Sequence, residues 1–405
     1  MGVNMYIKRT AEDVIKKLSN QFKVVLVTGA RQVGKSTLLK HCDKNRNYVS
    51  LDDLTEREMA INEPKLFLEN HKAPLIIDEI QYAPNLLSYI KLIVDNSEEK
   101  GQYWLTGSQQ FHLMKNISES LAGRVGIIDL MGFSLAEISQ HSNNKPFFPS
   151  NEYIENRKTN HKDYSTSEIF NFIYNGSYPA LNNNDNIDRD LFYSAYLRTY
   201  IERDIRDLSS ISNEMKFLNF IRVIAARTGQ VLKYSEIAKE VDISEPTAKN
   251  WLSILISSNL VYLLQPYYKN ITKRMTKMPK LYFLDTGLCA YLTGWSSPEV
   301  IQKGAMNGAF FETFVISEIL KSYRHNGERP LIYWYRDKQQ KEIDLLIEKN
   351  GKLHPIEIKL TSNPNKSMIK NFSILEYTTQ GALICTKEKD MLLTENVSII
   401  PVSYI

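Results

Sequence analysis

The stretch TGARQVGKST at 28–37 follows directly on a run of apolar, strand-forming residues. It fits the spacing G-x-x-x-x-G-K-[ST], with Gly29, Gly34, Lys35 and Ser36 at the fixed positions. The glycines let backbone N–H groups curl around phosphate oxygens, and a helix that begins at Lys35 points its positive end at the same place. The stretch therefore predicts a phosphate-binding loop, in which Lys35 binds the β- and γ-phosphates and Ser36 offers its hydroxyl to Mg²⁺.

Short apolar runs alternate with helix-length segments around this loop. Such runs, bounded by turn residues, are typical of buried parallel strands in an α/β sheet. The five expected strands lie at 23–29, 47–53, 73–80, 102–108 and 125–130. We therefore expect an α/β domain with a parallel sheet over residues 1–140. In that setting a chance glycine-rich turn is the weaker explanation of the loop.

Polar side chains lie next to three of these strands. Asp78 ends the run APLIID and is expected to hold Mg²⁺, and Glu79 beside it is placed to orient or deprotonate the attacking water. In this order the residues resemble P-loop ATPases of the AAA type, which have a polar sensor after the fourth strand and an arginine before the fifth. The resemblance implies that Ser108 senses the γ-phosphate and that Arg124 stabilises transition-state charge, in this chain or in a neighbouring copy. An ordinary surface or capping arginine is the alternative for Arg124.

The expected nucleotide site thus combines residues of three kinds. The catalytic residues are Lys35, Glu79 and Arg124. The ligands of Mg²⁺ are Ser36 and Asp78. The residues expected to bind ATP are Gly29, Ala30, Arg31, Gln32, Val33, Gly34, Lys35, Ser36, Thr37, Asp78 and Ser108.

Length and composition set the broad class. The 405 residues leave room for two or three domains, and 43% hydrophobic with 24% charged residues exclude a mainly disordered or fibrous chain. No run approaches the ~18 apolar residues of a membrane span, and the first residues lack the apolar core of a signal peptide. The three cysteines match no zinc or redox spacing, so we expect a cytoplasmic protein. A net charge of +4 permits an anionic partner without requiring one.

The middle of the chain is expected to form two further parts. Residues 141–214 predict a polar linker and a helical segment, because 141–167 is rich in Asn, Ser and Pro and has little periodicity. Residues 215–295 show a winged helix-turn-helix pattern, with short helices at 235–241 and 245–258 joined by the turn DIS.

The expected wing carries the most basic stretch of this part. The acid-free run KNITKRMTKMPK at 269–280 contains Lys269, Lys273, Arg274, Lys277 and Lys280. Such a run is suited to follow a nucleic-acid backbone. The expected recognition helix, by contrast, has Lys249 as its only cation, which is weak for reading bases. A solvated hairpin or a contact between subunits is the alternative for 269–280.

A β-hairpin is predicted near the end of the chain. The dipeptide Asn350-Gly351 separates two alternating apolar segments, which is a strong hairpin signal. If these two residues form the loop, Lys349 faces Lys352, and one face carries Asp344, Glu357 and Lys359. The residues expected on the other, buried face are Ile343, Leu345, Ile347, Ile356 and Ile358.

Two carboxylates opposite each other in a hairpin repel unless a cation lies between them. A divalent metal beside a lysine is one such arrangement, and it can activate water for phosphodiester cleavage. The pattern D…ExK, with an upstream amphipathic helix at 308–324, resembles the PD-(D/E)XK nuclease fold, although Ile343 stands where that fold often has proline. The resemblance implies a nuclease-like domain at 296–405 and a second divalent-metal site at Glu312, Asp344, Glu357 and Lys359. A solvated hairpin face held by ion pairs is the alternative.

The order of motifs along nearly the whole chain resembles a large family of prokaryotic AAA-type ATP-binding proteins that end in a domain of unknown function. The motifs are TGARQVGKST, PLIIDEIQ, LTGSQQF, SLAGR, GSYPAL, YIERDI, PKLYFLDTGL, FFETFV, EIDLLI and IEIK. The resemblance implies ATP binding followed by a winged-helix and nuclease-like half, and it supplies no substrate.

Three functions follow as hypotheses. The first is a Mg²⁺-dependent ATPase whose nucleotide state controls a DNA-facing C-terminal half. The second is a slow ATP-dependent switch or scaffold that binds a protein partner. The third is a metal-dependent nuclease gated by ATP. A homo-oligomer is required only if Arg124 acts on a neighbouring copy.

Overall fold

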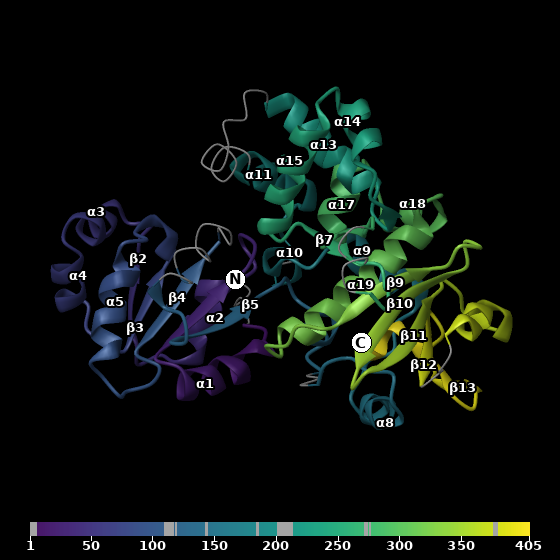
Figure 1. The fold of residues 1–405 in the computed structure, drawn as a ribbon, viewed down its shortest axis with the longest axis horizontal. Helices are drawn as coiled ribbons and strands as arrows, with labels where there is room; N and C mark the ends of the chain where they lie inside the picture. Colours follow the sequence, from purple (N-terminus) through teal and green to yellow (C-terminus); the bar gives the residue numbers. More distant parts are fainter. Residues whose placement is uncertain are drawn as a thin grey trace.

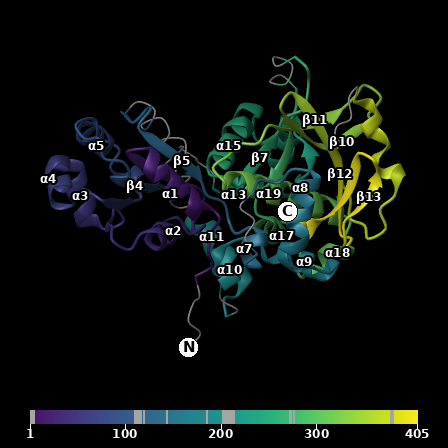
Figure 2. The ribbon, with the colours of Figure 1, turned by 90° about the horizontal axis from the view of Figure 1, so that it is seen from below.

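The computed structural model describes residues 6–108, 117, 120–141, 145–183, 186–200, 214–270, 274, 277–375 and 380–405. Figure 1 shows a first domain built on a parallel sheet, a second sheet near the C-terminus, and between them a helical region from which α13, α14 and α15 project. Figure 2, seen from below, separates the first domain from the rest of the chain in the same way.

The first sheet confirms the five expected strands. It has the order β2-β3-β4-β1-β5 and all of its pairs are parallel. The strands are β1 (Val24–Thr28), β2 (Asn47–Ser50), β3 (Leu75–Asp78), β4 (Tyr103–Gly107) and β5 (Val125–Asp129). Every residue of β1, β3 and β4 is buried, because helices pack on the sheet. These helices are α1 (Ala11–Gln21), α2 (Lys35–Cys42), α3 (Leu54–Asn62), α4 (Pro64–Asn70) and α5 (Leu86–Asp95).

Parallel pairing fixes where the polar residues lie. Since β1, β3 and β4 are neighbours and run in the same direction, their carboxyl ends share one edge of the sheet. The phosphate-binding loop, Asp78 and Ser108 follow these three ends, so the topology gathers them at that edge.

The segment 141–167 differs from the surface linker or loop expected for it. Part of it forms the helix α8 (Asn151–Thr159), which begins after Ser150, whose side chain accepts a hydrogen bond from the Tyr153 N–H. Arg157 is 1% exposed and donates to the Tyr404 carbonyl at 2.7 Å. The helix buries only Tyr153 and Ile154 as apolar residues and is otherwise anchored by polar contacts to the C-terminus, so it lacks the long apolar stripe by which hydrophobic periodicity reveals a helix.

The middle of the chain is helical and ends in a small sheet. Its first helices are α7 (Leu135–Ile138), α9 (Thr166–Asn175), α10 (Pro179–Asn183) and α11 (Arg189–Tyr200). Then follow α13 (Glu214–Ala226), β6 (Gln230–Val231), α14 (Tyr234–Val241), α15 (Glu245–Ser257), β7 (Val261–Leu264) and β8 (Lys280–Phe283). The strands pair antiparallel in the order β6-β8-β7, and the two helices expected at 235–241 and 245–258 are present as α14 and α15.

The C-terminal part places three helices before a six-stranded mixed sheet. The helices are α17 (Thr286–Leu292), α18 (Pro298–Lys303) and α19 (Asn307–Arg324). The sheet has the order β13-β14-β12-β11-β10-β9. Its strands are β9 (Ile332–Arg336), β10 (Glu342–Lys349), β11 (Lys352–Ile358), β12 (Gly381–Cys385), β13 (Met391–Thr394) and β14 (Val397–Pro401). Among the described residues, no helix is both long enough and apolar enough to cross a membrane.

The predicted hairpin register is correct. Lys349 pairs with Lys352 across a turn in which Asn350 and Gly351 have φ values of 52° and 71°. All five residues expected on the apolar face are buried, but a bulge between Ile343 and Leu346 places Ile343 in a different core cluster from the other four. The bulge adds a residue on one strand only, so strict alternation fails at that point.

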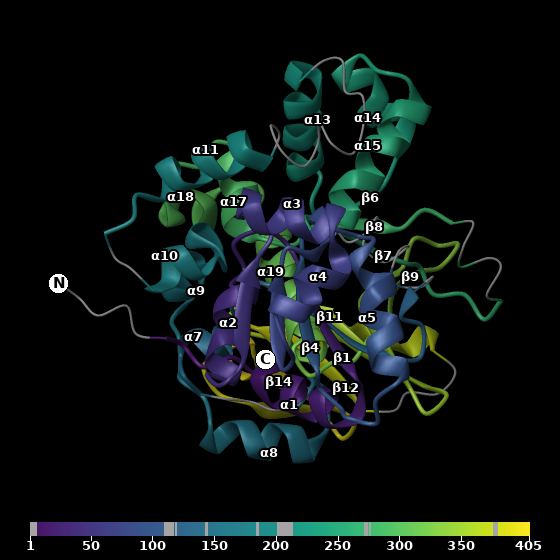
Figure 3. The same cartoon turned by 90° about the vertical axis from the view of Figure 1, so that its left-hand side faces the viewer.

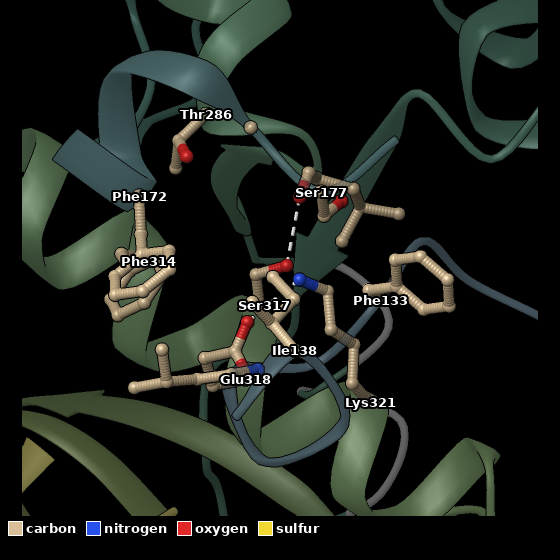
Figure 4. A pocket seen from close by; sticks show the side chains of 12 residues that line it. Phe133, Ile138, Phe172, Ser177, Thr286, Phe314, Ser317, Glu318 and Lys321 are labelled. Carbon is tan, nitrogen blue, oxygen red and sulfur yellow. Dashed lines mark hydrogen bonds and ion pairs between the residues drawn. The ribbon is translucent and has the colours of Figure 1, made fainter. Parts of the chain in front are cut away.

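The helix α19 is buried on almost all sides rather than amphipathic, because strands, helices and the first domain surround it. Figure 4 shows Glu318 and Lys321 of α19 pointing into a small cavity of about 10 Å³, with Phe133 and Ser177 on its wall. Glu318 accepts hydrogen bonds from the Leu135 N–H and from Lys321 Nζ, both at 2.7 Å. This helix therefore joins the C-terminal part to the end of the first domain.

Candidate nucleotide site

The loop at 28–37 has the backbone that its glycines predict. Gly29 has φ +149°, and a Cβ there would lie 2.1 Å from the Leu130 carbonyl oxygen. Gly34 has φ +91° and stands immediately before α2, which begins at Lys35 as expected. Both positions favour glycine, so the loop can present its N–H groups and the helix N-terminus to an anion.

Lys35 is 5% exposed, and its ammonium group lies against the loop. Its Nζ donates to the carbonyls of Gly29 and Ala30 at 3.2 and 2.9 Å. The cation is therefore held at the loop by weak acceptors. A phosphate oxygen, which carries a full charge, is a stronger partner for it.

Asp78 is the centre of a cluster of hydroxyl groups. Ser36 Oγ lies 2.7 and 2.9 Å from its two carboxylate oxygens, so the two expected Mg²⁺ ligands are in direct contact. Tyr48 OH donates to Asp78 Oδ2 at 2.8 Å, and Thr106 Oγ1 donates to Oδ1. All of these groups are oxygens, which Mg²⁺ prefers, and a site of few protein ligands is typical of an ion that also binds phosphates and water. Sequence reasoning missed Tyr48 and Thr106, which reach Asp78 only through strand pairing.

Glu79 and Ser108 are brought together at the same edge. Ser108 Oγ donates to Glu79 Oε2 at 3.3 Å. Glu79 has φ +58°, a left-handed conformation that is unusual for a residue with a Cβ. Its N–H donates to Thr106 Oγ1 at 3.0 Å. Gln81 donates to both side chains of the pair and was not singled out from the sequence.

Arg124 lies at the opposite end of the parallel strands from the phosphate-binding loop, and the structure does not bring it to the site of its own chain. It precedes β5, whose first residue pairs with the first residue of β1, whereas the loop follows the last residue of β1. At about 3.3 Å per residue, the length of β1 separates the two by roughly 15 Å. Arg124 pairs with Asp95 at the end of α5. A role in a neighbouring copy stays a prediction.

A buried cluster beneath the loop was not anticipated. Arg9 is 2% exposed and donates from Nη1 to the Val33 carbonyl of the loop at 3.0 Å. Its Nη2 donates to the Met131 carbonyl at 2.7 Å, and its Nε lies 3.2 Å from Glu137. His325, just past α19, lies 3.4 Å from both Arg9 and Glu137. No motif marked these residues, because they are far apart in sequence and each is ordinary in its local context.

The motifs GSYPAL and PKLYFLDTGL meet behind the loop. Asp285 caps α17 by accepting from the Leu288 N–H at 2.7 Å. It also accepts from the Ser177 N–H at 2.7 Å and from Tyr193 OH at 2.9 Å. A Cβ on Gly34 would lie 3.7 Å from Pro179. The middle of the chain therefore packs directly against the nucleotide loop, and Figure 2 shows α10, the helix that begins at Pro179, near α2.

The basic run 269–280 is less available to a nucleic acid than its sequence suggests. Lys280 is 3% exposed and pairs with Glu312 at 3.1 Å and with Glu342 at 2.5 Å. Burial alone would lower the pKa of Lys280, but the surrounding carboxylates raise it above its ordinary value. Arg274 pairs with Glu348 at 3.3 Å. Lys273 lies outside the described residues.

The four residues of the nuclease-like pattern form one cluster, in which lysines neutralise the carboxylates. Lys359 Nζ lies 3.1 Å from Asp344 Oδ2 and 2.7 Å from Glu357 Oε1. Glu312 accepts from Tyr282 OH at 2.6 Å. Burial and the neighbouring Asp344 raise the pKa of Glu357 to about 7, and its buried Oε2 has no hydrogen-bond partner within the part of the chain that the structure describes.

A metal at this cluster would have to displace the lysine contacts. Within the described ranges, no three His, Cys, Asp or Glu side chains are arranged to hold a metal ion. The orphaned Glu357 Oε2 is one acceptor that a cation would satisfy. The cluster therefore fits an internal ion-pair network better than a preformed metal centre.

Comparisons with known families divide the chain into three matched regions. Residues 21–139 match the family described as "AAA domain". Residues 166–299 and 307–405 match two families described as domains of unknown function, DUF8612 and DUF4143.

Similar whole chains are uncharacterised proteins. Rv2008c of Mycobacterium tuberculosis and Mb2031c of Mycobacterium bovis are each 26% identical over 400 residues, which cover 98% of this chain and 84% of the relative. Among solved structures, the Walker-type ATPase PABY2304 of Pyrococcus abyssi is 17% identical with a TM-score of 0.44, covering 71% of this chain and 96% of that one. AMPPCP-bound DnaA from Aquifex aeolicus is 14% identical with a TM-score of 0.29, covering 61% of this chain and 85% of that one.

The family match and the geometry agree on the first domain. The match covers β1 to β5, which carry the loop, Asp78 and Ser108. Residues 21–139 therefore match an AAA domain both in sequence and in the parallel sheet that carries the phosphate-binding loop, which supports a P-loop ATPase fold for this part of the chain.

Proposed function

We propose that this protein is a Mg²⁺-dependent ATPase whose nucleotide state is transmitted to its C-terminal half. The observation that carries the first part is the contact between the Ser36 hydroxyl and the Asp78 carboxylate, with Glu79 next to it. This contact supports the proposal because it brings the side chains proposed as metal ligands together beside the phosphate-binding loop, next to the residue proposed as the general base.

Each residue of the site has a distinct role in the proposal. Lys35 leaves the loop carbonyls and donates to the β- and γ-phosphates. Ser36 and Asp78 hold Mg²⁺, which when bound neutralises charge on the phosphates. Glu79 orients the attacking water and accepts its proton, and Ser108 donates to the γ-phosphate.

ATP turnover with an exact amino-acid control tests this proposal. We expect Glu79→Gln to bind ATP normally and to lose turnover by 10²-fold or more, because general-base catalysis contributes about 10²–10⁴-fold. Glu58→Gln makes the same chemical change at an exposed position on α3 and should match the wild type. Equal turnover in Glu79→Gln and wild type would refute the role of Glu79.

The buried cluster around Arg9 supports the second part of the proposal. One guanidinium contacts both the nucleotide loop and the residue that follows α19. If Val33 shifts on ATP binding, the contacts of His325 change with it, because the same guanidinium group bonds to both residues.

Hydrogen exchange tests this connection. In the wild type we expect ATP to change the protection of 318–325, and in Arg9→Met we expect that change to disappear while ATP still binds. An ATP effect on 318–325 that persists in Arg9→Met would contradict transmission through Arg9.

For the C-terminal half we propose a winged helix-turn-helix that faces DNA. The support is the element order helix, strand, helix, helix, strand, strand from α13 to β8, with its three-stranded antiparallel sheet. Lys280 and Arg274 are each paired with carboxylates of this chain, which weakens the case that 269–280 contacts DNA. Turnover of ATP with and without double- and single-stranded DNA tests the proposal, and stimulation by a protein partner but not by DNA would favour a switch or scaffold.

A nuclease gated by ATP is the second candidate. The unpartnered Glu357 Oε2 beside Asp344 and Lys359 is the observation in its favour. Cleavage of DNA in Mg²⁺ or Mn²⁺ by the wild type, lost in Asp344→Ala, would support it. Cleavage that is unchanged in Asp344→Ala and Glu357→Ala would come from elsewhere.

A further inference from the structure

The chain turns sharply after β3, and this turn places a glutamine beside the proposed base. Glu79 adopts the left-handed conformation, and a short 3₁₀ helix (Ile80–Tyr82) follows it at once. After this turn the side chain of Gln81 lies at the end of β3, within hydrogen-bond distance of Glu79 and Ser108. Thr106 holds this turn in place, because its hydroxyl accepts the Glu79 N–H and donates to Asp78.

Gln81 contacts both functional side chains of the pair. Its Nε2 donates to Glu79 Oε2 and, at 3.3 Å, to Ser108 Oγ. Ser108 Oγ in turn donates to the same Glu79 oxygen. Among the described residues, both side-chain donors to this carboxylate thus end on Oε2, which fixes its orientation and leaves Oε1 for another partner.

The other end of the amide is the unexpected feature. Gln81 Oε1 is buried and has no hydrogen-bond partner among the described residues. A buried carbonyl oxygen without a donor costs about 1–3 kcal/mol, so such atoms usually have a function or a water partner. Here the atom belongs to an amide whose nitrogen is already bound to the proposed base and to the proposed γ-phosphate sensor.

We propose that Gln81 is a positioning residue for ATP hydrolysis, whose amide nitrogen holds the Glu79 carboxylate and whose carbonyl oxygen accepts a hydrogen bond from the attacking water. The inference rests on the proposed function, because it needs Glu79 as the base. With one water proton directed to Gln81 Oε1, the other points to Glu79 Oε1, which accepts it as the oxygen attacks phosphorus. The bond between the γ-phosphorus and the bridging oxygen breaks, ADP leaves with its electron pair, and the water proton ends on Glu79.

The chain offers a matched control for the substitution. Gln102 also has a buried Oε1 that finds no partner among the residues described, and its Nε2 donates to Ser97 Oγ at 2.7 Å. It directly precedes β4, at the edge of the sheet opposite Ser108. Replacing either glutamine by leucine removes a similar set of buried contacts, but only one of them lies at the nucleotide site.

The test is a kcat and KM measurement on three enzymes. We expect Gln81→Leu to lower kcat by about 10- to 100-fold, a part of the 10²–10⁴-fold that a positioned base supplies, with the ATP dissociation constant within twofold of the wild type. Gln102→Leu should keep kcat within twofold. Gln81→Asn, which keeps the amide on a shorter stem, should recover part of the loss.

The outcomes separate this inference from the proposed function. If Glu79→Gln is inactive while Gln81→Leu and Gln102→Leu have the same kcat, the role of Gln81 is refuted and the ATPase stands. If Gln81→Leu does not fold, the test rests on Gln81→Asn. A Gln81→Asn enzyme that binds ATP normally and changes KM but not kcat refutes the role of Gln81 as well. A wild type that binds ATP and never hydrolyses it overturns both.

Discussion

Replacing Glu137 by glutamine removes the charge at the centre of the cluster under the nucleotide loop while keeping the side chain's size. The carboxylate accepts from Arg9 Nε at 3.2 Å and from the Thr10 and Ser134 N–H groups, both at 2.9 Å. The side chains of Arg9, Glu137 and His325 are each 2% exposed or less. A glutamine would turn an NH₂ group toward one of these donors and would leave the Arg9 charge buried and unpaired.

The expected cost follows from that burial. Breaking a buried ion pair by removing one partner costs about 3–5 kcal/mol, so the free energy of unfolding of Glu137→Gln should fall by that amount at pH 7. Urea unfolding measures it through the midpoint and slope. Glu152→Gln, which breaks an exposed pair with Lys145, is the control and should give no measurable change.

The same variant has a defined pH dependence. Burial alone would raise the pKa of Glu137, but Arg9, His325 and the Ser134 N–H lower it well below its ordinary value. A depressed carboxyl pKa contributes stability above the unfolded pKa of about 4.3 and loses it as the pH falls toward the folded value. The difference between wild type and Glu137→Gln should therefore be constant from pH 5 to 7 and shrink below about pH 4.3. A difference under 1 kcal/mol at pH 7, or one that grows in acid, would refute this account of the cluster.

Three further results are expected. Lys35→Ala should weaken ATP binding by tenfold or more in a fluorescent-nucleotide titration, because it removes the loop's only buried cation among the described residues; unchanged affinity would contradict the loop assignment. Asp285→Ala should destabilise the protein by about 2–4 kcal/mol in urea, since it removes the acceptor of the α17 N-terminus and of both the N–H and the hydroxyl of Ser177. Glu357→Gln should stabilise the protein at pH 8.5 relative to wild type but not at pH 4, because a raised carboxyl pKa contributes stability that is lost as the pH rises through about 7; thermal unfolding at the two pH values checks the sign.

The first domain was predicted well from the sequence, because short stretches of the chain determine its strands and its loop. Strands such as Val24–Thr28 are apolar on both faces, and the loop glycines are needed for backbone reasons that a motif records. The hairpin register likewise followed from a two-residue turn. In each case the residues that decide the structure are neighbours in the chain.

The surroundings of charged side chains were predicted less well, because the sequence does not show which residues lie next to them in the fold. The run 269–280 is free of acids, yet Lys280 is buried against Glu312 and Glu342, which come from another helix and another strand. Arg124 stands at the expected place in the motif order, but the direction of β5 puts it at the far edge of the sheet. The cluster around Arg9 joins three separate segments, so only the tertiary structure could reveal it.

The helix α19 connects the two clusters between which we propose communication. Glu312 lies near its start in the carboxylate cluster and His325 follows its end at the Arg9 cluster, about 20 Å apart along the axis. Because the helix is buried on almost every side, it can shift only as a body. Figure 3, viewed from the side of the first domain, shows α19 behind the strands of the first sheet.

Coupling through one rigid helix must be reciprocal. If ATP changes the affinity of the C-terminal half for a ligand by some factor, that ligand must change the affinity for ATP by the same factor. The dissociation constant of ATP with and without saturating DNA, and that of DNA with and without ATP, therefore gives two ratios that have to agree. In Arg9→Met both ratios should approach one together, since this variant cuts the connection without touching either ligand. Ratios that stay unchanged in Arg9→Met would show that the two halves communicate by a route other than Arg9, through the contact of Glu318 with the Leu135 N–H or the packing of Pro179 near the loop.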